Sequence, residues 1–188
     1  MILDEYRRYV AERFGFRTWT RVLAAADRPS TQQYGLGDVY PDEELGLLAA
    51  RTAEVTKTPP AEVLRGFGES LVPEMLRIYS YLLDPKWDFS AFLLNMEPML
   101  HAALKLHTPG AQPIKVQARR LGVDSVEVFY DSPLHACAAI EGVIRGAAAE
   151  YGVTAEVSQP ECALRGDQRC RFEVGVKARS DSRSSSPA

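Results

Sequence analysis

Apolar side chains in the first 107 residues recur every three or four positions, the spacing of amphipathic helices. Five helices are predicted: one ending at Gly15, one around Trp19, one after Pro41, one from Val63 to the Asp84-Pro85 pair, and one from about Ser90. Pro98 falls inside the fifth and is expected to interrupt its hydrogen-bond ladder.

From Ile114 the apolar period changes from 3.6 to 2, which is typical of half-buried strands. A first hairpin is predicted about Gly122 and a second about residues 165–168, so that Cys162 and Cys170 leave the second turn on opposite arms and can face each other. Together the patterns predict an α+β fold: an N-terminal helical bundle followed by an antiparallel sheet with one helix packed on it (ββαββ).

The helix between the two hairpins is predicted over residues 133–151, with Ser132 as its N-cap and Gly152 as the glycine that ends it. Ala138, Gly142 and Gly146 recur every fourth residue and leave one face of this helix without large side chains. We expect that face to lie flat on the sheet.

Composition narrows the class of protein. The chain has 188 residues, of which 46% are hydrophobic. Residues 1–177 are predicted to form one domain, helical to about 107 and sheet from about 113, followed by a Ser-rich, disordered tail at 178–188.

A net charge of -3 predicts neither a nucleic-acid partner nor a membrane surface. No signal peptide or membrane-spanning stretch is visible, which predicts a cytoplasmic protein. No phosphate loop, dinucleotide fingerprint or nucleophile triad is present, so we expect no enzymatic activity.

Three cysteines are too few for a disulfide scaffold, and their number is odd. Cys137, Cys162 and Cys170 are therefore interpreted as metal ligands, as packed thiols, or as a redox-active pair with a third neighbour. His101 is also open to two interpretations. It is either a half-buried histidine bonded to nearby backbone or, in its apolar helix, an axial ligand of haem iron.

Several segments in this order resemble the haem nitric oxide/oxygen-binding (H-NOX) domain family over the whole ordered chain. They are Tyr40-Pro-Asp-Glu-Glu, Leu64-Arg-Gly-Phe-Gly, Leu100-His101, Thr108-Pro-Gly-Ala-Gln-Pro113, Tyr130-Asp-Ser132 and Glu141-Gly-Val-Ile-Arg-Gly146. The resemblance implies a stand-alone sensor that binds haem b, with His101 as its proximal ligand, Pro113 against the porphyrin, and Tyr130 and Ser132 on the propionates. It also implies diatomic gas ligands such as nitric oxide and carbon monoxide. The expected partner is a signalling protein in trans, such as a histidine kinase, a diguanylate cyclase or a chemoreceptor.

The chain departs from the family pattern at one charged position. The family motif is Tyr-x-Ser-x-Arg, and Leu134 stands at the place of the arginine. Loss of a charge-assisted hydrogen bond to a propionate costs about 1.5 to 3 kcal/mol, or roughly 10- to 150-fold in affinity. The chain also begins some residues later than the family usually does. Ala139 and Ile140, on the expected distal side, offer no hydrogen-bond donor, which favours nitric oxide or carbon monoxide over oxygen.

The cysteine spacing is similar to the zinc site of the vinyl-reductase-type ligand-sensing domains. Zinc prefers four ligands, and the fourth is left open among Glu161, His135, Asp167 and water, with Gln159 at the position where an acidic residue is expected. The alternative function is thus a haem-poor relative that acts as a zinc-thiolate redox sensor or binds a small apolar molecule. A scaffold domain with a filled cavity is a third hypothesis.

Overall fold

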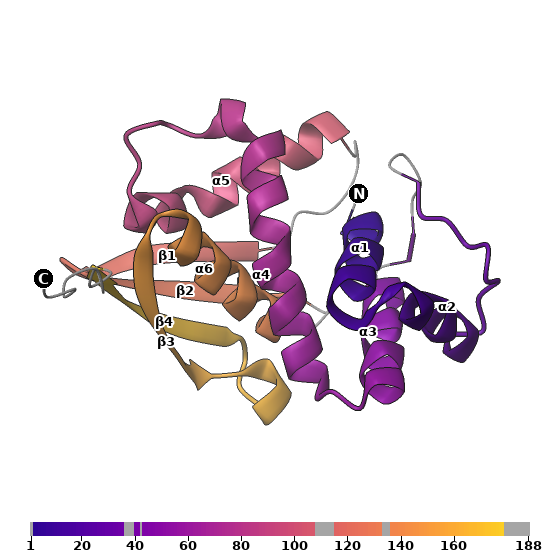
Figure 1. Cartoon of the computed structure of the whole chain (residues 1–188). Coiled ribbons are helices and arrows are strands. Elements are labelled where there is room, and N and C mark those ends of the chain that lie inside the picture. Colours follow the sequence, from indigo (N-terminus) through magenta and orange to yellow (C-terminus); the bar gives the residue numbers. More distant parts are fainter. Residues whose placement is uncertain (1, 36–39, 42, 108–114, 133–135, 179–188) are drawn as a thin grey trace, which may run out of the picture.

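A run of helices precedes an antiparallel sheet into which one further helix is inserted, which confirms the predicted α+β class (Figure 1). The computed structural model describes residues 2–35, 40–41, 43–107, 115–132 and 136–178. The helical half comprises α1 (Ile2–Phe14), α2 (Phe16–Ala25), α3 (Glu43–Thr56), α4 (Pro60–Ile78), the short 3-10 helix η1 (Ser80–Leu82) and α5 (Phe89–His107). The sheet half comprises β1 (Lys115–Gly122), β2 (Ser125–Asp131), α6 (Cys137–Glu150), β3 (Val153–Glu161), the short 3-10 helix η2 (Ala163–Arg165) and β4 (Cys170–Ala178).

The first core lies among α1, α2, α3 and the first half of α4. Its centre is aromatic: the ring of Tyr6 meets Phe67 edge-on at a centroid distance of 5.0 Å and lies beside Trp19. The buried hydroxyl of Tyr6 donates a hydrogen bond to Thr52 Oγ1 at 2.8 Å. Apolar and polar ends of the tyrosine are thus both satisfied, which fixes α1 against α3.

The second core lies between the sheet and helices α5 and α6. The four strands are antiparallel in the order β1-β2-β4-β3. Along the central pair, Val126 is opposite Val174, Val128 is opposite Phe172 and Tyr130 is opposite Cys170, and all six residues are buried. The alternate positions carry charge: Glu127, only 2% exposed, accepts hydrogen bonds from Arg119 and Arg171. The period of two therefore separates a packed face from an ion-paired face.

Helix boundaries differ from the predictions at two places. Helix α4 ends at Ile78, and not at Asp84, and the tighter 3-10 helix η1 follows it. The prediction was too long because apolar residues keep a helical spacing through η1, and this spacing does not distinguish a 3-10 helix from an α-helix. Helix α6 begins at Cys137 with Ala136 as its N-cap, so the prediction of Ser132 as the cap is wrong. The helix does end as predicted, with Gly152 at a φ of 69°.

Pro98 does not break α5, although it removes one backbone donor from the helix interior. Buried side chains on both sides of the proline, among them Phe92, Met96 and Met99, pack into the second core. Tertiary packing therefore holds the helix together through the position where the sequence predicts an interruption.

The glycine face of α6 packs against α4 and not against the sheet, so that prediction is wrong. A Cβ atom built on Gly142 would lie 2.0 Å from the carbonyl oxygen of Arg65, and one built on Gly68 of α4 would lie 2.1 Å from that of Ala139. The opposite face of α6, which carries Ile144 and Ala147, packs against the sheet. The two helix backbones therefore touch at a point where only glycine fits.

Ion pairs flank this glycine contact. Arg65 of α4 donates to Glu141 of α6 at 3.0 Å, and Arg145 donates to the same carboxylate at 2.9 Å. Burial alone would raise the pKa of Glu141, but the two arginines lower it below its usual value.

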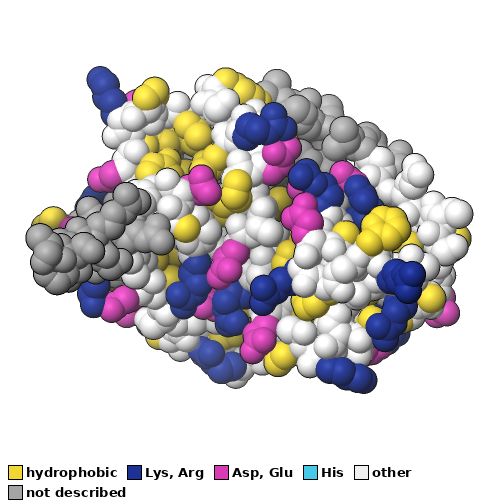
Figure 2. Space-filling view, viewed as in Figure 1, with side chains coloured by type: hydrophobic (Ala, Val, Ile, Leu, Met, Phe, Trp, Pro, Cys, Tyr) yellow, Lys and Arg dark blue, Asp and Glu magenta, His cyan; other side chains and the backbone are white. Residues whose placement is uncertain are grey.

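The surface shows no concentration of one charge on the face drawn in Figure 2, where basic and acidic side chains alternate. Within the described part of the chain, no helix has both the length and the apolar character that crossing a bilayer requires.

The space around each glycine predicts opposite effects for one substitution at the α4–α6 contact and one away from it. Gly142→Ala forces a methyl group against backbone, so we expect it to lower the free energy of unfolding by at least about 1 to 3 kcal/mol. Gly46→Ala is the matched control in helix α3, where a Cβ meets no atom within 4 Å; it should raise stability by roughly 0.5 to 1 kcal/mol. Urea unfolding measures both, and a Gly142→Ala variant as stable as the parent would contradict the close contact.

Candidate functional site

His101 lies near the end of the described side chains of α5, and it is half-buried. It directly follows Leu100, which packs against the second core. Its Nε2 atom is buried and has no hydrogen-bond partner among the described residues. A buried ring nitrogen without a partner is costly unless something else binds it. The site therefore fits a group that accepts a nitrogen ligand, such as haem iron.

Tyr130 lies near the end of β2, and Ser132 directly follows that strand. Tyr130 is 2% exposed, and burial raises the pKa of its hydroxyl, while hydrogen bonds with the Ser132 side chain and the Ala136 backbone act in the opposite direction. Tyr130 is thus a neutral phenol that can donate a hydrogen bond to an anionic oxygen. Two residues of the predicted haem site lie outside the described residues: Pro113, which is expected to contact the porphyrin, and Leu134, which stands at the arginine position.

A hollow of about 270 Å³ opens where β2 ends and β4 begins. We refer to it as the strand-end hollow; it is lined by Tyr130, Asp131, Ser132, Ala163, Gln168, Arg169 and Cys170. The guanidinium of Arg169 lies over the ring of Phe129, 3.9 Å from its centroid. Arg169 forms no ion pair with any described carboxylate, so its positive charge remains available at the rim.

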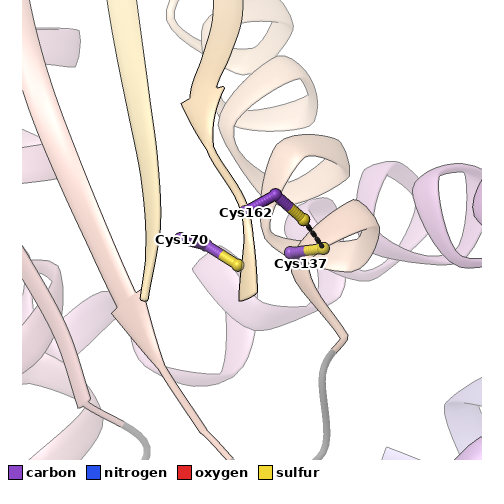
Figure 3. A group of neighbouring side chains, drawn as sticks. All are labelled: Cys137, Cys162 and Cys170. Carbon is purple, nitrogen blue, oxygen red and sulfur yellow. Dashed lines mark hydrogen bonds between the residues drawn. The ribbon is translucent and has the colours of Figure 1, made fainter. Parts of the chain in front are cut away.

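The three cysteines form a buried cluster (Figure 3). Cys137 begins α6, Cys162 follows β3, and Cys170 begins β4, so three separate elements each contribute one thiol. The Sγ atoms of Cys137 and Cys162 are 3.8 Å apart, and all three sulfur atoms lie within 4.8 Å of one another. Within the described chain they form a group that could hold a metal ion. The predicted approach of Cys162 and Cys170 is confirmed, and the fold adds Cys137 to them.

Backbone amides point at two of the sulfur atoms. Ala163 N–H donates to Cys170 Sγ at 3.4 Å. Burial alone would raise the pKa of Cys162, but the Leu164 backbone N–H, the other two thiols and the Arg165 charge lower it. Burial raises the pKa of Cys170 to about 12. Of the three thiols, Cys162 is therefore the one whose pKa the surroundings lower.

The sequence leaves the fourth ligand open among Glu161, His135, Asp167 and water, with Gln159 at the position where an acidic residue is expected. Glu161 accepts a hydrogen bond from Arg171 at 2.8 Å, and Asp167 accepts one from the Cys162 backbone at 2.7 Å. The buried amide nitrogen of Gln159 faces Cys137 and counters the rise in the pKa of that thiol caused by burial, but it makes no hydrogen bond of normal geometry to a described residue. His135 lies outside the described residues.

Sequence reasoning missed the backbone donors of the cluster. The segment after Cys162 forms the short helix η2 and closes with Gly166 at a φ of 98°, which turns the Ala163 and Leu164 amides toward sulfur. The signal was present as a cysteine followed four residues later by a glycine before an aspartate. Such a turn makes a nest of N–H groups around an anionic atom.

Comparison with known proteins identifies the class to which this fold and these residues belong. The family model described as Haem-NO-binding matches residues 1–159. The chain therefore belongs to the haem-NO-binding family. Among curated proteins, none matches it.

Solved H-NOX structures share the fold. A variant H-NOX protein from S. oneidensis in the Fe(II) state superposes with a TM-score of 0.85 at 20% identity, covering 96% of each chain. The Fe(II)NO state from S. oneidensis gives 0.84 at 20% identity, covering 94% of this chain and 97% of the other. A single-residue variant of the T. tengcongensis H-NOX protein gives 0.77 at 17% identity, covering 93% and 94%. None of these comparisons supports the likeness of the cysteine pattern to vinyl-reductase-type domains.

Proposed function

We propose that the protein is a haem-based sensor of nitric oxide, with His101 as the proximal ligand of the iron, and that it regulates a partner protein in trans. The observation that carries this proposal is the buried Nε2 atom of His101, which has no partner among the described residues. Membership of the haem-NO-binding family supports the same assignment. When bound, the haem supplies an iron atom that takes a diatomic gas.

The residues of this chain hold and tune that group. His101 presents a buried imidazole nitrogen from an apolar helix, and Tyr130 and Ser132 offer hydroxyl donors to the propionates. Ala139 and Ile140 of α6 bring no side-chain donor to the expected distal side, which favours nitric oxide and carbon monoxide over oxygen.

Loss of the imidazole tests the proposed ligand. Protein expressed with added haem precursor should show a strong Soret band that shifts with nitric oxide, and His101→Ala should lose the band because the iron has no axial nitrogen. His107→Ala, in the same helix, is the control and should keep it. A colourless parent protein, or a His101→Ala variant with the parent spectrum, would contradict the assignment.

Restoring the family arginine tests the propionate clamp. Leu134→Arg completes the family's Tyr-x-Ser-x-Arg motif and is expected to add a charge-assisted hydrogen bond to a propionate, so we expect haem to dissociate more slowly, with affinity higher by roughly 10- to 150-fold. Transfer of haem to excess apomyoglobin measures the rate. Leu134→Gln, of similar length without charge, is the control, and equal rates for all three proteins would contradict the clamp.

A second candidate function follows from the cysteine cluster. Three buried thiols within 4.8 Å of one another, with amide donors at two of them, are a suitable site for zinc, and oxidation of the thiols would release the ion. In this alternative the domain senses oxidants through zinc-thiolate chemistry and binds haem weakly or not at all.

Metal analysis of freshly reduced protein tests this alternative. We expect about one zinc per chain, lost when all three cysteines are changed to serine, together with a lower melting temperature because bound metal stabilises the native state. Iron analysis of the same sample separates the two functions. Zinc-free protein whose triple variant melts at the parent temperature would exclude the zinc function and leave the haem function untouched.

A further inference from the structure

Three thiol donors meet at the cysteine cluster, but the described residues near it provide no free fourth donor. Zinc sites that serve structure alone are closed by four protein ligands, whereas sites with three keep a position for an outside ligand. Glu161 accepts a hydrogen bond from Arg171 and Asp167 accepts one from the Cys162 backbone, and neither carboxylate belongs to the group that the three thiols form. Among the described residues the protein ligands therefore number three, which points to an open site.

Gln159 lies beside Cys137 at the edge of the thiol cluster. The pairing of β3 with β4 is irregular between Ser158 and Glu161, and such irregularities re-aim side chains. Here the irregular segment includes Gln159, whose amide nitrogen is buried beside Cys137. An N–H group stabilises a thiolate but does not bind a cation, so Gln159 lies at the cluster without closing it.

The strand-end hollow gives access to the cluster from outside. Cys170 belongs both to its lining and to the thiol cluster, and Ala163, which also lines the hollow, donates its backbone N–H to Cys170 Sγ. Arg169 and Gln168 are part of the same lining, and the Arg169 guanidinium has no carboxylate partner among the described residues. The lining thus holds the cation of Arg169 and the carboxylate of Asp131, and an anionic ligand is favoured on the Arg169 side of the hollow.

We propose that the cluster is a three-thiolate metal site whose fourth position is open to a small thiol that enters through the strand-end hollow. This inference builds on the zinc alternative above. Binding replaces a zinc-bound water by the sulfur: the zinc–oxygen bond breaks, a zinc–sulfur bond forms, and the thiol proton passes to solvent. Arg169 offsets part of the negative charge that the incoming thiolate brings.

Cobalt(II) tests the proposal because it replaces zinc and, unlike d¹⁰ zinc, has visible bands that report its ligands. Reduced protein made without added haem precursor is loaded with one equivalent of cobalt and then titrated with β-mercaptoethanol. We expect the bands to shift with saturation. Bands that stay unchanged would show a closed fourth position and overturn the proposal while leaving the metal site in place. Failure to take up cobalt would overturn both.

Gln159→His provides a second test by adding a ligand where the amide lies. It should bind metal more tightly, because it adds a fourth protein ligand, and abolish the response of the spectrum to β-mercaptoethanol. Ser158→His is the matched control, because Ser158 is exposed on the same strand, and it should behave as the parent. A Gln159→His variant that folds, binds cobalt and still responds to the thiol would overturn the assignment of the open position.

Discussion

The close approach of α4 and α6 is the constraint on which the rest of the structure depends. Helix α4 contributes Phe67 to the aromatic core of the helical half and Val72 to the core under the sheet, so it belongs to both. Gly68 and Gly142 let the two helix backbones touch, and the Arg65–Glu141 ion pair lies beside them. The contact therefore joins the helical half to the sheet half.

The contact also places the first residue of α6. Because the helix is fixed along its length against α4 on one side and the sheet on the other, its N-terminus has one position relative to the β3–β4 hairpin. Cys137 stands at that N-terminus and Cys162 at the end of β3, and their sulfur atoms are 3.8 Å apart. The thiol cluster is therefore a product of helix packing as much as of the hairpin that carries the other two cysteines.

Local patterns in the sequence predicted the element order and the fold class, because periods of 3.6 and 2 depend only on which side chains are apolar. They also predicted that Cys162 and Cys170 would meet, since a hairpin brings its arms together. They failed where the answer depended on a distant partner. Gly142 and Gly146 indicate that something comes close, but not whether it is a helix or a sheet. The predicted start of α6 was wrong for a similar reason, because Ser132 has the chemistry of an N-cap although Ala136 is the N-cap residue.

For the candidate sites, the sequence indicated His101 through its apolar helix, and the structure adds that its Nε2 atom is buried without a described partner. The position of Gln159 beside Cys137 depends on an irregular strand pairing, which no local pattern predicts.

The pairing of Tyr130 with Cys170 carries a consequence for how this chain can vary. One residue belongs to the proposed propionate clamp and the other to the thiol cluster, and both occupy the same rung of the sheet. A single-residue insertion in β2 or β4 would shift the register by one step and turn one of these side chains to the opposite face. Variants that keep both sites should therefore hold the lengths of these two strands constant. Changes in length should gather at the β1–β2 tip, where Leu121 and Val123 are exposed.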